Sequence, residues 1–571
     1  MKRILSFTLA FLLLSALLLT AASCAEKTET SKETPTATGE QTLSGETATE
    51  APTEPTAPSL PDVSEIRGEV EKPVINERFD GETIRFFVSG GEGSLNARSI
   101  CIGENDDPND PVNVAVKKRN EKVEEELGVK IELTETKNMV ESLGYLAPVL
   151  ASKTYVYDVL ALYQYYDLGL AYGDTTGCFY NYYRMPDDSY IDLDAKYWQR
   201  ACVDAIQMQN VAYFLTGDLN LNTLSAMEVS FVNAAMWEKY QDRIAALENN
   251  PEGYTSVYDL VNNGYWTMDL WCELSQMPYK DLNENGAADY GDELGLIVYE
   301  EGLECLMTDM FAAGAGVVYS TVTERNVEVI VNDKHNDYKP TEISYYGKAP
   351  EIAINTDHNK EIYAKLYTLL CQSNAANVPW MTKDNGEDLY IMEAFAEGNI
   401  LLTVDALSSA EQYLSGMKDG YYIMPLPLYD RDQFDASLPS LGYLTQCEDT
   451  LSHYAICAAV DPHKIPAITA TMELMGWYAL TMTTPAYLDK ALKGGYTERT
   501  ENAVILDRIR AGMYFDFADL WGSSLDNPKW FARENYTQFG DKLGRILKQQ
   551  QDKKTMKLKY FLGRFWECFD A

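Results

Sequence analysis

The chain has 571 residues and carries 87 Asp and Glu against 47 Lys and Arg, a formal net charge of −40. A charge of this sign argues against nucleic acid and against an anionic membrane surface as partners. Hydrophobic residues make up 46% and aromatic residues 12%, which suits a globule. The roughly 500 residues beyond the N-terminal region are too many for one core and predict two or three lobes.

Residues 1–23 read as a lipoprotein signal peptide. Lys2 and Arg3 supply a positive start, and the apolar stretch at 4–19 is too short and too broken by Ser and Thr for a permanent membrane span. Small residues then precede Cys24 in the sequence AASC, similar to a lipobox. We expect lipidation of Cys24 and a location on the extracellular face of the cell membrane. The alternative is an ordinary secretory signal with an incidental cysteine.

Residues 24–74 form a segment of low complexity, rich in Thr, Glu, Pro, Ser and Ala and free of aromatic residues. Such a composition cannot bury enough apolar surface to offset the entropy cost of ordering. We therefore predict a flexible tether between the anchor and the globule.

The globule begins with alternating strand and helix patterns. Residues 83–88, 129–133 and 157–162 read as strands, and residues 112–127 read as a helix with an apolar stripe that Gly128 ends. Strand, helix and strand in alternation predict an α/β fold, in which helices cover both faces of a parallel sheet.

A short helix and an acidic loop follow at residues 266–292. Thr267 can cap the helix and Asp269 suits its positive end. The loop, DLNENGAADYGD, matches the first nine positions of a calcium loop of the EF-hand type, although its twelfth residue is Asp. The alternative is an Asn- and Gly-rich surface turn without metal. The predicted ligands of a structural calcium ion are Asp281, Asn283, Asn285, Ala287, Asp289 and Asp292.

The helix opening WTMD, followed by a loop that ends in DYG, resembles the extracellular solute-binding proteins, family 1, of bacterial ABC sugar importers. Further segments resemble this family in the same order along nearly the whole globule. They are RNEKVEEELGVKIEL, YIDLDAKYW, a strand at 211–218, a strand at 229–233, a strand within FAEGNILLTVD at 395–405, YYIMPLP at 421–427, a strand at 454–460, a helix at 461–479 and a mostly helical end from 519.

The resemblance implies a two-lobed periplasmic-binding-protein-like fold of type II, with discontinuous lobes joined by a hinge. The solute-binding domain would span residues 75–571. Its first lobe would comprise about 75–210 and 400–455, and its second lobe about 215–395 and 460–571. A ligand cleft would lie between them, because open α/β sheets bind ligands beyond the carboxyl ends of their strands.

A sugar presents apolar faces for aromatic rings and hydroxyl groups for carboxylates and amides. Residues of these types follow predicted strands or precede the crossing between lobes. For each aromatic residue the alternative is core packing, and for each Asp it is a helix cap or turn. The candidate ligand-binding residues are Tyr163, Tyr165, Tyr166, Asp218, Trp380, Asp405 and Tyr443.

The resemblance implies a monomeric receptor that captures a carbohydrate, most simply an oligosaccharide, and delivers it unaltered to ABC transporter permease subunits. It would use no organic cofactor and bind no nucleic acid. The alternatives are a surface sensor or adhesin with the same fold, or a secreted carbohydrate-active enzyme with paired carboxylates. No G-x-S-x-G, H-E-x-x-H or phosphate-binding glycine loop occurs, and the four histidines lack zinc spacing.

Overall fold

The structure is a computed structural model. The residues that it describes are 70–91, 94–103, 106–136, 138–171, 177–277, 280–282, 284–286, 288–302, 304–332, 340–373, 376–378, 380–383, 385–491 and 499–565. The predicted signal peptide, Cys24 and nearly all of the predicted tether lie outside them. No helix in the described part of the chain is both long enough and apolar enough to cross a membrane.

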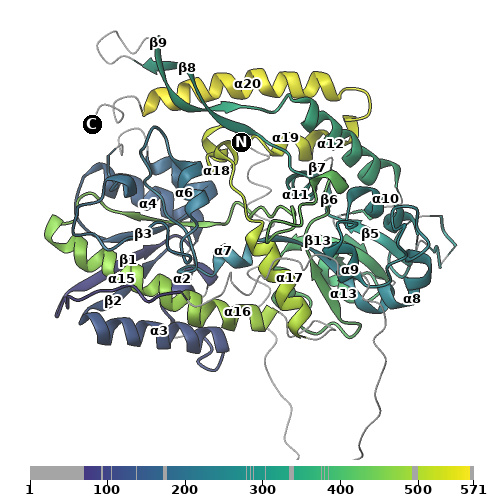
Figure 1. Cartoon of the computed structure of the whole chain (residues 1–571), viewed down its shortest axis with the longest axis horizontal. Helices are drawn as coiled ribbons and strands as arrows, with labels where there is room; N and C mark the ends of the chain where they lie inside the picture. Colours follow the sequence, from purple (N-terminus) through teal and green to yellow (C-terminus); the bar gives the residue numbers. More distant parts are fainter. Residues whose placement is uncertain are drawn as a thin grey trace, which may run out of the picture. The chain divides into compact units, whose positions relative to one another are not determined.

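The first sheet has the strand order β15-β3-β1-β2 (Figure 1). Its first three strands in sequence are parallel, whereas β15 enters from late in the chain and runs antiparallel to β3. The strands are β1 (Thr83–Val88), β2 (Lys130–Glu135), β3 (Val159–Tyr163) and β15 (Ser452–Ile456). The predicted strands at 83–88, 129–133, 157–162 and 454–460 are thus confirmed, with small shifts at their ends.

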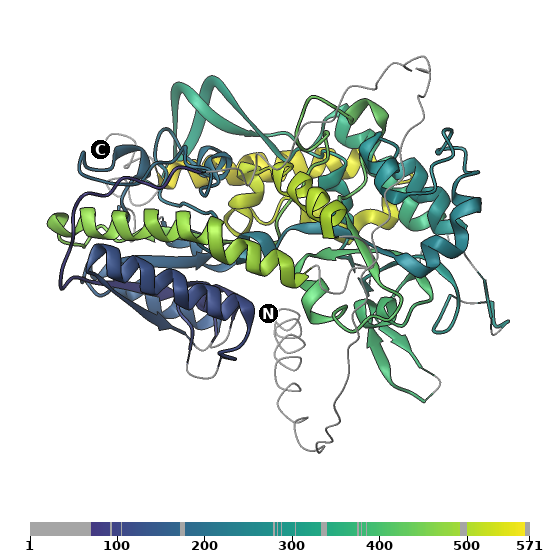
Figure 2. The same cartoon turned by 60° about the horizontal axis from the view of Figure 1, so that its bottom comes forward.

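Helix α3 (Pro111–Leu127) confirms the predicted helix at 112–127. The Asp110 carboxylate accepts hydrogen bonds from the first backbone N–H groups at 2.8 and 3.2 Å, and Gly128 ends the helix with φ 73°. Its apolar stripe is buried in the core. Helix α15 (Ile465–Tyr478), the predicted late helix, lies alongside α3 (Figure 2).

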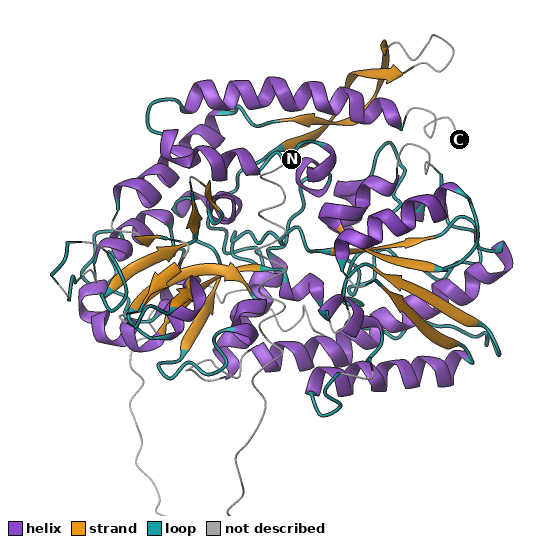
Figure 3. Cartoon of the chain, turned by 180° about the vertical axis from the view of Figure 1, so that it is seen from behind, coloured by secondary structure: helices purple, strands orange, loops and turns teal. Residues whose placement is uncertain are grey.

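The second sheet has the order β10-β5-β13-β4-β14. Strands β5, β10 and β13 are parallel to one another, and β4 runs antiparallel to both of its neighbours. In Figure 3 the strands gather in two sheets with helices around each. The strands are β4 (Glu228–Asn233), β5 (Leu294–Val298), β10 (Ala376–Asn377), β13 (Ile400–Ala406) and β14 (Tyr421–Met424).

Helix α10 (Met268–Gln276) confirms the helix predicted before the acidic loop. Its N-cap is Thr267, whose hydroxyl accepts a hydrogen bond from the Leu270 N–H at 3.3 Å. Trp266 and Trp271 are fully buried and meet edge to face at 5.3 Å. Burial of large aromatic surfaces at this point anchors the helix on the second sheet.

The remaining elements surround the two sheets, and α20 lies along the long β8–β9 hairpin (Figure 1). The C-terminal region is mostly helical, as predicted. The remaining strands are β6 (Glu300–Glu301), β7 (Glu304–Cys305), β8 (Ser320–Asn332), β9 (Pro340–Ile352), β11 (Trp380–Thr382) and β12 (Asp388–Tyr390). The remaining helices of six or more residues are α2 (Leu95–Ile100), α4 (Met139–Ala151), α6 (Arg200–Ile206), α8 (Ala234–Ile244), α9 (Val257–Asn262), α11 (Thr308–Gly314), α12 (Asp357–Tyr367), α13 (Ile391–Ala396), α16 (Thr484–Ala491), α17 (Arg499–Ala511), α19 (Trp530–Asn535) and α20 (Leu543–Arg564).

Two predicted features differ from the structure. Residues 211–218 form isolated bridges, at Val211, Leu215 and Gly217, rather than a strand. This segment connects the first sheet to β4 of the second sheet, and it does not pair continuously with a strand of either. Strands β13 and β14 pair with β4, so most of the segment 400–455 belongs to the second sheet and only β15 joins the first. An apolar strand is buried in either sheet, and its sequence does not say which partner it takes.

Candidate functional site

One connecting segment, residues 445–451, contacts the carboxyl end of a parallel strand in the first sheet. Strand β3 ends at Tyr163 and leads into α5 (Gln164–Asp167). The Gln164 N–H donates to the Leu451 carbonyl at 2.9 Å, and the Tyr165 N–H donates to the Asp449 carbonyl at 3.2 Å. Backbone hydrogen bonds therefore fix the acidic residues of this segment beside the tyrosines that follow β3.

The same segment reaches the carboxyl end of β13 in the second sheet. Asp405 lies near the end of β13, and the first residue of β4, Glu228, pairs with Ala406. The Glu228 N–H donates to the Gln446 carbonyl at 2.9 Å. The carboxyl ends of β3 and β13 thus both meet residues 445–451, at the position where α/β sheets usually bind ligands.

Ion pairs connect residues 445–451 to α18 (Phe517–Leu520) and to the residue before α19. The ammonium of Lys529, 3% exposed, lies 2.6 Å from Asp449 Oδ1 and 3.1 Å from Asp519 Oδ1. A narrow, shallow recess lies beside these groups and is lined by Gln164, Tyr165, Asp449, Asp519, Leu520, Gly522, Ser523, Asn527 and Lys529. A second ion pair lies deeper, where Arg533 donates to both oxygens of Asp309 at 2.9 and 2.6 Å.

Burial and neighbouring charges together shift the pKa values of these carboxyl groups in different directions. It raises the pKa of Glu448 to about 7, with the negative charges of Asp405 and Asp449 adding to the effect. It also raises the pKa of Asp405 and of Asp519 to about 6. Burial alone would raise the pKa of Asp449 too, but the Lys529 ammonium lowers it below its ordinary value. The site thus combines ionised carboxylates with carboxyl groups that titrate close to neutrality.

Aromatic rings flank the carboxyl groups on two sides. Tyr165 stacks on Trp530 with ring centroids 5.4 Å apart and planes 13° apart, and Tyr166 meets Tyr165 edge to face at 4.7 Å. Across the carboxyl groups, the rings of Tyr390 and Tyr413 are in contact, with centroids 5.4 Å apart. The negative charges of Asp405 and Glu448 contribute to a raised pKa of the Tyr390 hydroxyl. Trp380, 42% exposed, meets Tyr390 edge to face at 6.2 Å. We refer to these residues together as the acidic–aromatic site: Tyr165, Tyr166, Glu228, Trp380, Tyr390, Asp405, Tyr413, Glu448, Asp449, Asp519, Lys529 and Trp530.

Four of the seven predicted ligand-binding residues gather at the acidic–aromatic site. They are Tyr165, Tyr166, Trp380 and Asp405. Tyr163 lies beside them at the end of β3, but it is only 7% exposed and burial raises its pKa to about 12.

The other two predicted residues have their polar groups engaged inside the protein. Asp218 is fully buried, with the Nη2 group of Arg510 2.7 Å from both of its carboxylate oxygens. Tyr443 is also fully buried and donates its hydroxyl hydrogen to the Val261 carbonyl at 3.0 Å. In this arrangement both side chains are part of the core, the alternative that the sequence left open.

Several residues of the site were not predicted from the sequence. Glu448 and Asp449 lie a few residues before β15, and two adjacent carboxylates near the start of a strand could have been recognised as candidates. Lys529 and Trp530 lie in the helical C-terminal region and reach the site only through tertiary folding. Tyr390 and Tyr413 flank short helices in the second half of the chain, and no local pattern distinguishes them from core tyrosines.

The predicted calcium loop is only partly described, since Asn283 and Ala287 lie outside the described residues. Gly286 adopts φ 82° and donates its N–H to Asp281 at 2.6 Å, as a tight loop requires. Asp292 accepts hydrogen bonds from the Leu282 and Asp289 N–H groups at 2.9 and 3.2 Å. No three His, Cys, Asp or Glu side chains in the described part of the chain form a metal-binding group. The oxygen donors suit calcium by type, and calcium at this loop stays a prediction.

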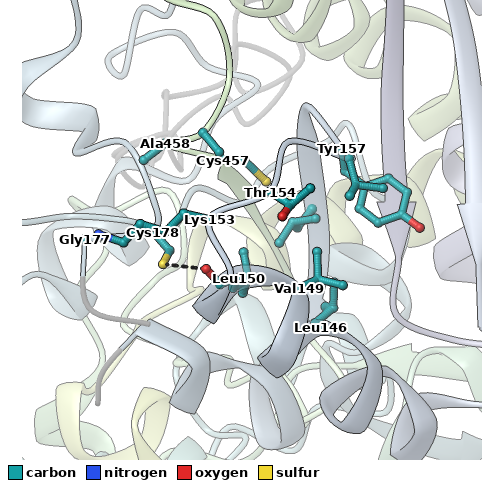
Figure 4. A pocket seen from close by; sticks show the side chains of 13 residues that line it. Leu146, Val149, Leu150, Lys153, Thr154, Tyr157, Gly177, Cys178, Cys457 and Ala458 are labelled. Carbon is teal, nitrogen blue, oxygen red and sulfur yellow. Dashed lines mark hydrogen bonds between the residues drawn. The ribbon is translucent and has the colours of Figure 1, made fainter. Parts of the chain in front are cut away.

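A separate recess lies at the opposite end of β3, near its first residues (Figure 4). It has about 690 Å³ of empty volume, including its mouth. Its walls are mostly apolar, with Leu146, Val149 and Leu150 on one side and Cys178 and Cys457 on the other. The Cys178 thiol donates to the Leu150 carbonyl at 3.4 Å. Lys153, Thr154 and Tyr157 also line this recess, but no carboxylate among the described residues does.

Comparison with known proteins gives distant structural likenesses. No protein-family model matches the sequence, and no curated protein matches it. The chain is similar in structure to an ABC substrate-binding protein from Listeria monocytogenes in complex with cycloalternan, at 11% identity and a TM-score of 0.45, over 84% of this chain and 100% of the other. The GacH receptor of Streptomyces glaucescens gives 12% identity and a TM-score of 0.45 over 85% and 100%. An ABC transporter solute-binding protein from Agrobacterium radiobacter, in complex with ribitol, gives 13% and 0.41 over 84% and 100%.

The fold itself is defined by the strand orders. In both sheets the three parallel strands have the order second, first and third, and an antiparallel strand follows the third: β15 in the first sheet and β4, with β14 beyond it, in the second. The chain therefore has a two-lobed α/β fold of the periplasmic-binding-protein type II, with discontinuous lobes. The predicted fold class is confirmed.

Proposed function

We propose that the protein is an extracellular solute-binding protein, held at the membrane by a lipid on Cys24. It would capture a carbohydrate between its two lobes and deliver it unaltered to the permease of an ABC transporter. Ligand binding would stabilise the closed population of a hinge motion between the lobes.

One observation carries this proposal: aromatic rings and carboxylates converge at the carboxyl ends of β3 and β13, where both sheets meet residues 445–451. Ring faces can stack on the apolar faces of sugar rings, and carboxylates accept hydrogen bonds from sugar hydroxyls. Trp380 presents an exposed indole that contacts Tyr390, the tyrosine on which the charges of Asp405 and Glu448 act. The structural likenesses are too distant to bear on the ligand, so the proposal rests on these residues and on the order of the sequence motifs.

A thermal-shift screen of mono- and oligosaccharides tests the proposal. A ligand that binds only the folded protein stabilises it and so raises its melting temperature. At a hundredfold excess over Kd the free energy of unfolding increases by about 2.7 kcal/mol. We expect at least one saccharide to do so, and Trp380→Ala to weaken that effect. If no saccharide shifts the melting temperature, the protein does not have a carbohydrate as its solute.

A glycosidase is the second candidate, and one observation favours it. Glu448, with its pKa raised to about 7, lies close to Asp449, whose pKa is lowered. A protonated carboxyl beside an ionised one is the combination that acid–base glycoside cleavage uses. Incubating the protein with the stabilising saccharide and measuring new reducing ends separates the two functions, because a transport receptor releases its ligand intact.

A further inference from the structure

The acidic–aromatic site and its surroundings contain more carboxylates than cations. Among the residues that the structure describes, we consider six carboxyl groups of this region and the two cations that accompany them, Lys529 and Arg533. The carboxyl groups belong to Glu228, Asp309, Asp405, Glu448, Asp449 and Asp519. Each cation is already engaged, since Arg533 pairs with Asp309 and Lys529 lies between two aspartates.

Glu228 is a buried carboxyl group of this set, and one of its oxygens has no hydrogen-bond partner in the described part of the chain. Its side chain is 1% exposed, and its Oε2 atom has no hydrogen-bond partner among the residues that the structure describes. Its charged neighbours are two cations, Lys529 and Arg533, that other carboxylates already engage, and the carboxyl groups of Asp309, Glu448 and Asp519. A buried carboxyl group without a partner costs stability unless it is protonated or a positive charge binds next to it.

Glu448 lies on the segment that is hydrogen-bonded alongside Glu228. Glu448 is half-buried, and the charges of Asp405 and Asp449 act on its carboxyl group. Its own charge acts on Glu228 and on Tyr390. The Glu228 N–H, bonded to the Gln446 carbonyl, holds the two glutamates on adjacent segments. A cation that enters at Glu448 therefore compensates both groups.

The surroundings favour an organic cation over a metal ion. In the described ranges no three His, Cys, Asp or Glu side chains are arranged as metal ligands. Tyr390 and Tyr413 instead place aromatic rings beside the carboxyl groups. Rings and carboxylates together are the groups that recognise ammonium, through cation–π attraction and charge-assisted hydrogen bonds.

We propose that the captured saccharide carries a protonated amine, and that its ammonium group binds at Glu448 and compensates the buried Glu228. The ligand class would be amino sugars or oligosaccharides that contain a free amine. This inference rests on the proposed carbohydrate-binding function and narrows its ligand.

Matched saccharides test this inference. Short oligomers of glucosamine, of N-acetylglucosamine and of glucose with the same linkage differ only at one substituent, and a second series in the galacto configuration covers the other common stereochemistry. We expect at least one amine-bearing member to raise the melting temperature most, and to bind about tenfold to hundredfold more tightly than its N-acetyl and hydroxyl counterparts in calorimetry.

Two variants locate the effect. Glu448→Gln keeps the shape of the side chain and removes its charge, so the amine-bearing and N-acetyl oligomers should then bind within about threefold of each other. Glu228→Gln should also reduce the difference in affinity between the amine-bearing and N-acetyl oligomers. This second variant keeps the test decisive if the first one folds poorly. Glu132→Gln, on an exposed side chain paired with Lys130, is the matched control and should change nothing.

The outcomes separate the inference from the function on which it rests. If neutral saccharides bind as tightly as the amine-bearing ones, the amine inference is wrong and the carbohydrate-binding function stands. If Glu448→Gln leaves the preference for amines intact, the ammonium does not bind at this carboxyl group, and the inference is also wrong. If no saccharide in either series stabilises the protein, both are overturned.

Discussion

Replacing Asp218 by alanine should destabilise the protein without a direct effect on the acidic–aromatic site. The Asp218 carboxylate is fully buried, and the Nη2 group of Arg510, itself 5% exposed, lies 2.7 Å from both of its oxygens. Alanine would leave this guanidinium buried without its counter-charge. Breaking a buried ion pair in this way costs about 3–5 kcal/mol.

The size of the thermal shift follows from the length of the folded chain. Unfolding entropy near the melting temperature is about 2.1 cal/mol/K per residue, so roughly 500 residues give about 1 kcal/mol/K. The melting temperature of Asp218→Ala should therefore fall by about 3–5 °C in differential scanning calorimetry. Glu132→Ala, which breaks the exposed pair with Lys130, should change stability by less than about 1 kcal/mol.

A double variant distinguishes lost charge compensation from lost packing. Asp218→Leu combined with Arg510→Met replaces the pair with apolar groups, and it should recover most of the lost stability. The reasoning would be refuted if Asp218→Ala melted like the parent protein and instead lost saccharide affinity. Asp218 would then be a ligand contact, as the sequence suggested, rather than half of a buried ion pair.

Three further predictions concern the site, its titration and the acidic loop. Trp380→Ala should weaken saccharide binding about twofold to tenfold in calorimetry with little loss of stability, because its exposed indole contributes stacking rather than core packing. Stability should fall as pH rises from about 4.5 to 7, because the folded state binds the Glu448 proton more tightly than the unfolded state does, and Glu448→Gln should flatten this part of the stability curve. A calcium chelator should lower the melting temperature of the parent protein but not of Asp281→Ala, since bound calcium offsets the repulsion between loop carboxylates.

Each of these predictions has a contrary result. The control for Trp380→Ala is Tyr346→Ala, which removes a 67% exposed ring on the β8–β9 hairpin. If both variants lost the same saccharide affinity, the effect of Trp380→Ala would not come from a contact between Trp380 and the ligand. A Glu448→Gln variant with an unchanged pH profile would place the titrating group elsewhere. A melting curve that chelation leaves unaltered would remove calcium from the acidic loop.

Local sequence patterns were sufficient for several of the elements. The cap at Asp110, the apolar stripe of α3 and the left-handed Gly128 define that helix without help from distant residues. Thr267 defines the start of α10 in the same way. Capping and periodicity depend on neighbours within a few residues, so they can be read directly from the chain.

The pairing of strands and the composition of the site were decided by tertiary structure. Strand β13 is fully buried and apolar in its first residues, and nothing in those residues distinguishes a place beside β4 from a place beside β3. Asp218 and Asp405 both looked like aspartates at the end of a strand, yet Asp218 meets Arg510, 292 residues away in the sequence, and Asp405 meets Ser409. Whether a carboxylate is half of a buried ion pair or part of a ligand site depends on which distant charge folding brings next to it, and that partner is not encoded in its local sequence.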